Sequence, residues 1–158
     1  KRIVVTDPLP AKREIAQQRG ADAVVDALAS DFVEQVREAL GESADVVFDC
    51  VAIQPTVDQA VAMADKGGTV VIVGVPTGAV TVPLPIIQDH QIRIQGSATY
   101  LPEDYADAIR LLASGAIPVE AIVTAVHPMA AVAEAFDASL SGANIKVLVA
   151  IDEDLART

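Results

Sequence analysis

Asp7 is the residue whose type and position most directly suggest chemistry. It ends an apolar stretch, residues 2–7, and two prolines, Pro8 and Pro10, follow it closely. In sheets that bind dinucleotides, a carboxylate at the end of a strand accepts hydrogen bonds from the hydroxyl groups of the adenosine ribose. The same charge would repel a 2′-phosphate and so favour NAD over NADP. An aspartate before prolines can equally serve as a turn or helix-capping residue, and position alone leaves the two interpretations balanced.

The remaining side chains that often do chemistry form no recognisable site. Cys50 lies within an apolar run and has no partner cysteine, which favours a buried structural thiol. His90 and His127 are far apart in the sequence and match no metal-ligand spacing. Ser97 and Ser141 lack the glycine-flanked turn of a nucleophilic serine. We therefore expect no catalytic residue and no metal-binding residue in this chain.

The composition bounds the partners and the fold. The chain has 158 residues, of which 52% are hydrophobic, and a formal net charge of −11. This acidity argues against nucleic acids and membranes as partners, because nucleic acids and anionic lipids both need a basic surface. No apolar run reaches the ~18 residues of a membrane span, and a single cysteine suits a reducing, cytoplasmic setting. The aliphatic residues suit one domain built on a parallel sheet with both faces covered.

Strand and helix patterns alternate along the chain, which predicts an α/β fold with a doubly wound parallel sheet. Asp31 and Glu34 are expected to form a capping box, and the fifth helix is expected to bury Tyr105, Ile109 and Leu112. The acidic tail, residues 152–158, is expected to be frayed. The expected strands span residues 2–7, 23–26, 45–51, 69–73, 91–96, 119–126 and 145–151, and the expected helices span residues 11–19, 31–40, 55–64, 86–90, 102–113 and 128–140.

The expected binding edge follows from this order of elements. Ligands of open parallel sheets bind at the carboxyl ends of the strands. In this chain those ends are Asp7, Asp26, residues 49–52 and residues 73–76. The residues alone therefore indicate an acidic α/β fold of nucleotide-binding type without a catalytic centre.

The order of short motifs resembles the C-terminal half of the medium-chain, zinc-type alcohol dehydrogenases. The resemblance covers nearly the whole chain, and residues 96–104 are similar to the sorbitol, threonine and butanediol dehydrogenase branch. It implies a partial NAD-binding Rossmann domain over residues 1–118 and a C-terminal helix and strand over residues 119–158. The motifs are Val-Val-Thr-Asp (4–7), Arg-Gly-Ala (19–21), Ala-Asp-Val-Val-Phe-Asp (44–49), Lys-Gly-Gly-Thr-Val-Val-Ile-Val-Gly-Val-Pro (66–76), Ile-Gln-Gly-Ser (94–97), Leu-Leu-Ala-Ser-Gly-Ala-Ile (111–117), Ala-Glu-Ala-Phe (133–136) and Lys-Val-Leu-Val (146–149).

The resemblance implies that NAD is the cofactor and assigns residues to its adenosine half. Asp7 and Lys12 match positions that hold the adenosine ribose, and Val51 matches a position that packs near the adenosine. Lys146 falls where the family often has a basic residue near the pyrophosphate. Without the resemblance, Lys12 would be interpreted as a solvated lysine.

Other residues match the nicotinamide half and the assembly of the family. Val73, Ser97 and Thr99 match positions whose backbone holds the nicotinamide carboxamide, and Val75 matches a position beside the ring. Residues 92–96 match a strand that pairs across a dimer interface, so a homodimer or homotetramer is implied. In such enzymes a zinc ion polarises the oxygen of a small alcohol or polyol while NAD takes the hydride. That zinc belongs to the parent enzyme's catalytic domain, and this chain is not expected to bind it.

The resemblance also indicates what the chain lacks. It has no G-x-G-x-x-G turn and no first strand, so we expect an incomplete Rossmann-type sheet in a fragment that is inactive and binds NAD weakly. The strands that end at Asp7 and Asp49 would lose the neighbour between them. We hypothesise that residues 145–151, or a segment outside this chain, fill that place. Two alternatives stay open: a zinc-free quinone or enoyl reductase of the same superfamily, and a nucleotide-sensing Rossmann module without catalysis.

Overall fold

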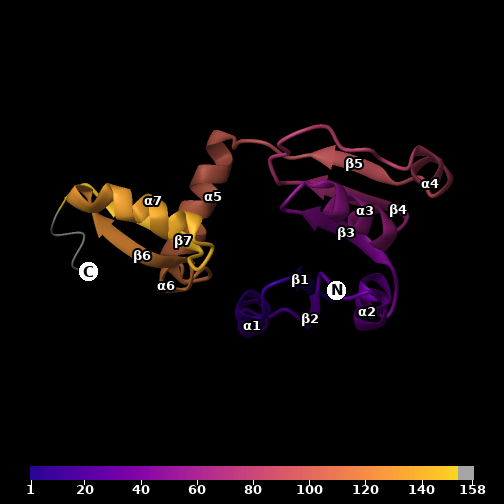
Figure 1. The fold of residues 1–158 in the computed structure, drawn as a ribbon, viewed down its shortest axis with the longest axis horizontal. Helices are drawn as coiled ribbons and strands as arrows, with labels where there is room; N and C mark the ends of the chain where they lie inside the picture. The colour runs from indigo at the N-terminus through magenta and orange to yellow at the C-terminus, as the bar shows by residue number, and fades with distance from the viewer. Residues whose placement is uncertain (153–158) are drawn as a thin grey trace. The chain divides into compact units, whose positions relative to one another are not determined.

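The structure is a computed structural model, and it describes residues 1–152. The chain divides into two compact units, Lys1–Ala98 and the segment that begins at Thr99 (Figure 1). Each unit combines helices with parallel strands, which confirms the predicted α/β class. The domain boundary expected after residue 118 stays a prediction, since a compact unit need not coincide with a domain. Of the tail that was expected to fray, all but Asp152 lies outside the described residues.

The first unit follows the predicted order of strands and helices. A proline occupies the first turn of α1, α3 and α4, where its missing N–H costs nothing. Gly41 ends α2 with a φ of 82°, a conformation that residues with a Cβ atom resist. The elements are β1 (Val4–Asp7), α1 (Pro10–Gln18), β2 (Ala23–Asp26), α2 (Phe32–Leu40), β3 (Ala44–Asp49), α3 (Gln54–Met63), β4 (Ala64–Ile72), α4 (Leu84–Asp89) and β5 (Arg93–Gly96).

The second unit differs more from the prediction. The segment expected to be extended from residue 119 begins instead with a short helix, which Pro118 precedes and Glu120 supports in its first turn. The stripe expected to be buried on α5 is exposed, and Tyr105 and Ile109 are 60% and 65% accessible, because α5 contacts little of its own unit. The elements are α5 (Pro102–Ala113), α6 (Val119–Ile122), β6 (Val123–Pro128), the 3₁₀ turn η1 (Met129–Ala131), α7 (Val132–Leu140) and β7 (Lys146–Ala150). None of the helices in residues 1–152 is long and apolar enough to cross a membrane.

The strands of the first unit form two parallel sheets that share no strand. β1 pairs with β2, with Asp7 opposite Asp26, and β4 lies between β3 and β5. β7 pairs with β6, so the hypothesis that residues 145–151 fill the place beside β1 and β3 is wrong. The reason is local, since β6, α7 and β7 form a strand–helix–strand unit of their own. Among the described residues, β1 and β3 each keep one edge without a partner strand. A segment outside this chain as the missing neighbour stays a prediction.

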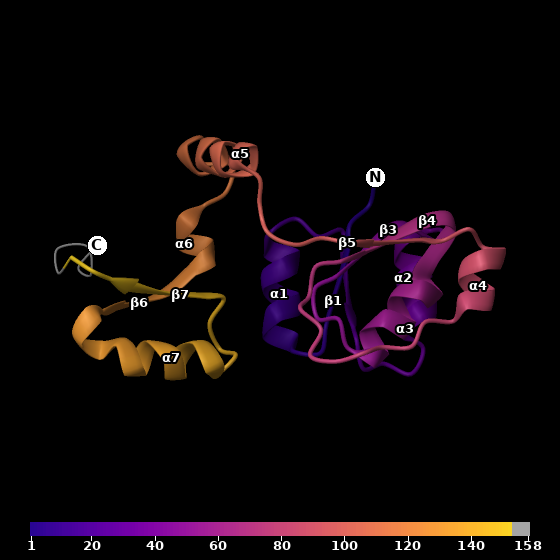
Figure 2. The ribbon, with the colours of Figure 1, turned by 90° about the horizontal axis from the view of Figure 1, so that it is seen from above.

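A common hydrophobic core nevertheless joins the two sheets. The apolar side chains of α2 and α3 pack into this core, and Figure 2 shows these helices beside each other. Val47 of β3 packs against both buried clusters, and Val70 of the central strand β4 is fully buried. The first cluster contains Val25, Phe32, Val36 and Met63, and the second contains Ala60, Val61, Ala64, Val70 and Ile92.

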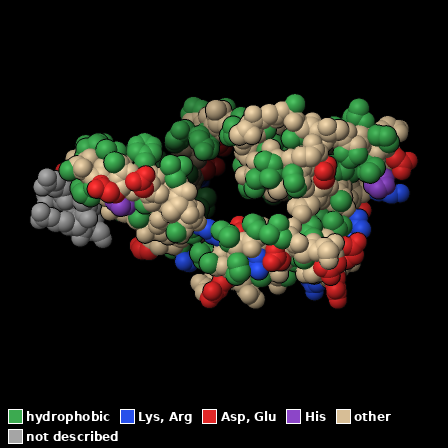
Figure 3. Space-filling view, in the orientation of Figure 1, with side chains coloured by type: hydrophobic (Ala, Val, Ile, Leu, Met, Phe, Trp, Pro, Cys, Tyr) green, Lys and Arg blue, Asp and Glu red, His purple; other side chains and the backbone are tan. Residues whose placement is uncertain are grey.

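Alternate side chains of β3 face away from this core. Val46 and Phe48 are 48% and 66% exposed, so the prediction of a fully buried strand is wrong for one face. Cys50 is also exposed, which corrects the prediction of a buried thiol, because the strand ends at the preceding residue. Figure 3 shows hydrophobic side chains, coloured green, open at the surface.

Lys1 Nζ donates a hydrogen bond to Asp45 Oδ2 at 2.9 Å, and this contact raises the pKa of Lys1.

Two local predictions fail for identifiable reasons. Asp31 precedes α2 but makes no capping hydrogen bond, because its Oδ1 accepts one from Gln35 Nε2 at 2.7 Å. The strand expected to begin at residue 69 begins at Ala64 instead, and its pairing with β3 shifts between Ala44 opposite Ala64 and Val46 opposite Thr69. The sequence pattern therefore predicted these helices and strands, but it predicted their first and last residues less accurately.

Candidate functional site

Asp7 lies where a strand-end ligand residue is expected, and it also makes a turn. Its Oδ1 accepts a hydrogen bond from the N–H of Leu9 at 2.7 Å, which fixes the chain before α1. Its Oδ2 accepts no hydrogen bond from the residues that the structure describes, and the side chain is half-buried. The two interpretations of Asp7 are therefore compatible, because the turn occupies one oxygen and leaves the other for a ligand.

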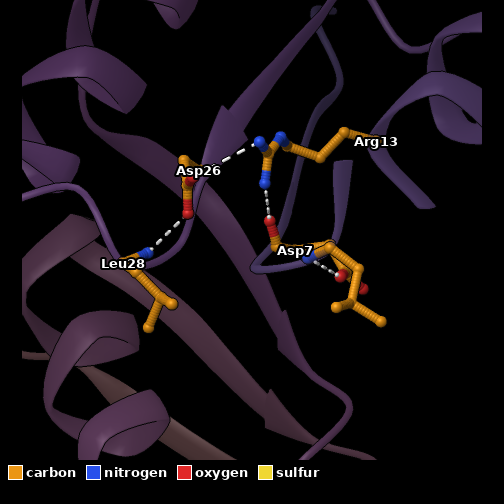
Figure 4. Close-up of polar contacts among 5 residues, drawn as sticks. Asp7, Arg13, Asp26 and Leu28 are labelled. Carbon is orange, nitrogen blue, oxygen red and sulfur yellow. Dashed lines mark hydrogen bonds and ion pairs between the residues drawn. The ribbon is translucent and has the colours of Figure 1, made fainter. Parts of the chain in front are cut away.

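Arg13 connects the carboxyl ends of β1 and β2. One guanidinium nitrogen donates to the carbonyl oxygen of Asp7 at 2.7 Å, and the other lies 3.3 Å from Asp26 Oδ2 (Figure 4). The Arg13 side chain is only 17% exposed, whereas that of Asp26 is 43% exposed. Asp26 Oδ1 accepts a further hydrogen bond from the N–H of Leu28 at 2.9 Å. The cation is thus held against the protein by two acceptors rather than extended into solvent.

Asp49 organises the loop that follows β3. Its Oδ1 accepts hydrogen bonds from the N–H groups of Val51 and Ala52 at 3.0 and 2.9 Å, and its Oδ2 accepts one from Thr56 Oγ1 at 3.0 Å. Asp49 is only 5% exposed, so these contacts are what make its burial tolerable. Ala52 has a φ of 60°, which is strained for a residue with a Cβ atom. We infer that the Asp49 carboxylate stabilises this conformation.

Gly74 brings the loop after β4 against the loop after β3. The carbonyl oxygen of Asp49 accepts hydrogen bonds from the N–H groups of Val73 and Gly74 at 2.8 and 2.9 Å. A Cβ atom on Gly74 would lie 2.5 Å from the carbonyl carbon of Val51, closer than real side chains approach. The close approach therefore needs glycine, and it sets Gly74 against the backbone of Val51 and Ala52.

The apolar candidates at this edge are open to a ligand. Val51, Val73 and Val75 are 54%, 42% and 86% exposed. Ser97 belongs to the same unit, where its N–H donates to the carbonyl oxygen of Ile72 at 2.9 Å. The structure therefore gathers Val51, Val73, Val75 and Ser97 at the carboxyl ends of one sheet, and it places Asp7 at the end of the other.

The remaining candidates are less closely gathered. Lys12 lies on the first turn of α1, five residues after Asp7. Thr99 and Lys146 belong to the second unit. Thr99 has a φ of 58°, an unusual conformation for a β-branched residue. The roles of all eight residues in cofactor binding stay predictions.

Thr56 offers a test of how the loop after β3 is held. Its Oγ1 bonds Asp49 and accepts from the N–H of Ile53 at 3.1 Å. We expect Thr56→Val to lower the free energy of unfolding by about 1.5 kcal/mol, because the Asp49 carboxylate and that N–H lose a partner. Urea denaturation measures the change. Thr77→Val is the matched control, since Thr77 is exposed, and it should change stability by less than about 0.5 kcal/mol. Equal effects of the two variants would contradict this account.

Sequence reasoning missed the roles of Arg13 and Asp49. Asp49 ends one of the motifs that resemble the family, but nothing in a linear pattern shows that Asp49 is buried or that Arg13 bridges two strands. The usable signal for Asp49 was a carboxylate at the end of an apolar strand with Thr56 seven residues later. Within residues 1–152, no three His, Cys, Asp or Glu side chains form a group that could hold a metal ion.

Parallel strands, crossover helices and a carboxylate at a strand end define the class of Rossmann-like α/β proteins. The chain belongs to the zinc-binding dehydrogenase family, whose model matches residues 2–114. The family resemblance predicted from the motifs is thereby confirmed.

The curated proteins that this chain resembles include dehydrogenases of sorbitol and of L-galactonate. An L-galactonate-5-dehydrogenase of Escherichia coli K12 is 34% identical over 136 residues, which are 85% of this chain and 40% of the relative. A sorbitol dehydrogenase of Arabidopsis thaliana is 32% identical over 155 residues, which are 93% of this chain and 42% of the relative. This chain thus spans less than half the length of these relatives.

Solved structures confirm the fold. A Sinorhizobium meliloti 1021 zinc-binding dehydrogenase structure bound to NADP matches with a TM-score of 0.83 and 30% identity, over 94% of this chain and 45% of that one. An Escherichia coli alcohol dehydrogenase complexed with NADH matches with a TM-score of 0.77 and 21% identity, over 91% of this chain and 42% of that one. Both forms of the dinucleotide therefore occur among proteins with this fold.

Proposed function

We propose that this chain is the NAD-binding part of a zinc-type dehydrogenase that oxidises a polyol or another secondary alcohol. In that reaction the alcohol carbon gives a hydride to NAD⁺, the hydroxyl group loses its proton, and a ketone forms. Family membership supports the reaction class, and the relatives acting on sugar alcohols and sugar acids support the substrate class. The observation that carries the proposal is the Asp7 carboxylate at the end of β1, whose Oδ2 accepts no hydrogen bond within residues 1–152.

The residues present suit a dinucleotide. Asp7, with Lys12 nearby, would hold the adenosine ribose, because an ionised carboxylate accepts two hydroxyl hydrogen bonds. The exposed side chains of Val51 and Val75 would pack against the adenosine and the nicotinamide ring, respectively. The backbone of Val73, and of the other candidates Ser97 and Thr99, would hold the carboxamide, and Lys146 would lie near the pyrophosphate. The Asp7 charge supports NAD rather than NADP as the cofactor.

The residues present do not suit a zinc site. The described part of the chain contains no group of three metal-ligating side chains, so we assign no step of the reaction to zinc on this chain. It also contributes no acid, base or nucleophile that we assign to the chemistry. We therefore propose that this chain is inactive by itself and that the catalytic residues lie elsewhere in the parent enzyme. A cytoplasmic location and a homodimer or homotetramer that uses residues 92–96 complete the proposal.

Titration of the ¹⁵N-labelled chain with NAD and AMP tests the proposed function. We expect both ligands to shift the amide resonances at the end of β1 and after β3, and NAD alone to shift those after β4. The absorbance of NADH should not rise when sorbitol is added with NAD. A chain that binds neither nucleotide would overturn the binding proposal, and alcohol-dependent NADH formation would overturn the proposed inactivity.

A further inference from the structure

The contacts of Arg13 and Asp26 bear on which dinucleotide the site accepts. In Rossmann-like sites a carboxylate at the strand end selects NAD, whereas a nearby arginine can accommodate the 2′-phosphate of NADP. This chain has both groups, since Arg13 donates to the carbonyl oxygen of Asp7 at 2.7 Å. Arg13 therefore contacts the backbone of the residue whose carboxylate would hold the ribose. Whether Arg13 can leave its present contacts then decides whether a 2′-phosphate can form an ion pair with it.

Asp26 makes that arginine unavailable. Its carboxylate lies 3.3 Å from the Arg13 guanidinium, and the Arg13 side chain is 17% exposed. Turning toward a phosphate would break this ion pair and the hydrogen bond to Asp7 together. The formal charges of Asp7, Lys12, Arg13 and Asp26 add up to zero, so a phosphate entering beside them would meet no net attraction while Arg13 stays paired with Asp26.

We propose that Asp26 is a specificity-determining residue, which excludes a 2′-phosphorylated nucleotide by holding Arg13 in an ion pair. This inference rests on the proposed function, because it concerns the same ribose site. It adds that the discrimination between NAD and NADP depends on Asp26 at the end of β2, and not on Asp7 alone. Neutralising Asp26 releases Arg13 and removes one negative charge, and the 2′-phosphate gains an arginine partner.

Two short ligands test the inference without requiring a whole dinucleotide: AMP and adenosine 2′,5′-bisphosphate. For Asp26→Asn we expect the affinity for the bisphosphate to rise about tenfold, while the affinity for AMP changes by less than about twofold. Asparagine can still accept the hydrogen bond from Leu28, so the turn after β2 should persist. Asp26→Ser is a second variant that also retains an acceptor, in case the first one folds poorly. NMR titration measures each dissociation constant.

Two controls separate this mechanism from a general change in charge. Asp65→Asn removes an equal charge from an exposed residue near the start of β4, and it should leave the preference unchanged. Adding Arg13→Gln to Asp26→Asn should abolish the gain, because the released cation is then missing. A gain that is equal in Asp65→Asn, or that survives Arg13→Gln, would overturn the role of Asp26 while AMP binding still supports the proposed function. Failure of the unaltered chain to bind AMP would overturn both proposals.

Discussion

Replacing Asp7 by asparagine lowers the affinity for NAD by about 10- to 100-fold, if its carboxylate holds the adenosine ribose as proposed. The substitution changes one charge and little else. The asparagine carbonyl oxygen can keep the hydrogen bond from the N–H of Leu9, which is 2.7 Å long. The lost contribution is that of charge-assisted hydrogen bonds to the ribose, typically about 1.5–3 kcal/mol. NMR titration or calorimetry with NAD measures the loss of affinity. The ratio of the affinity for NAD to the affinity for NADP should fall at the same time.

Asp65→Asn is the control that distinguishes the role of Asp7 from an effect of net charge. Asp65→Asn makes the same chemical change at an exposed position near the amino end of β4, away from the carboxyl ends of the strands. We expect this variant to bind NAD with unchanged affinity. An equal loss in both variants would reduce the effect to net charge, and an unchanged affinity in Asp7→Asn would remove the residue from the binding site.

Gly74→Ala should have the largest effect on stability, about 3 kcal/mol of unfolding free energy. The added Cβ atom would lie 2.5 Å from the carbonyl carbon of Val51, 2.6 Å from its nitrogen and 2.8 Å from the nitrogen of Ala52. All three are backbone atoms, so no side chain can rotate away to relieve the overlap. The loop after β3 must move, and its contacts with Asp49 weaken with it. Urea denaturation followed by circular dichroism measures the loss.

Gly78→Ala is the natural comparison for this variant. A Cβ atom at Gly78 meets nothing within 4 Å, and the backbone there does not have the positive φ that favours glycine. Alanine in such a position commonly changes stability by less than about 1 kcal/mol, often in the favourable direction, because it restricts the unfolded chain. A Gly74→Ala variant as stable as Gly78→Ala would show that the two loops are not in the tight contact described.

The sequence predicted the parts of this molecule that depend on periodicity. The alternation of strand and helix patterns implied parallel pairing with binding residues at the strand ends. Asp7 and Gly74 were both noticed for their positions at such ends. These features are local, so a pattern in one segment is sufficient to reveal them.

Other features depend on what a segment meets, and no linear pattern contains that. An apolar run predicts that Val46 and Phe48 belong to a strand, but it cannot say whether a second layer covers them. The ion pair of Arg13 and Asp26 requires the register of β1 against β2. The strained φ of Ala52 was invisible because the position carries no glycine. The carboxylate of Asp49 holds that turn where glycine would otherwise be expected.

The division of the first unit into two sheets has a consequence for binding and folding together. The adenosine ribose candidate, Asp7, belongs to one sheet, and the nicotinamide candidates Val73 and Val75 follow the other. A dinucleotide held at both ends would bridge two sheets that share a core but no strand. Each half of the ligand then raises the effective concentration of the other at its site. NAD should therefore raise the melting temperature of the chain more than AMP and nicotinamide mononucleotide do when added together.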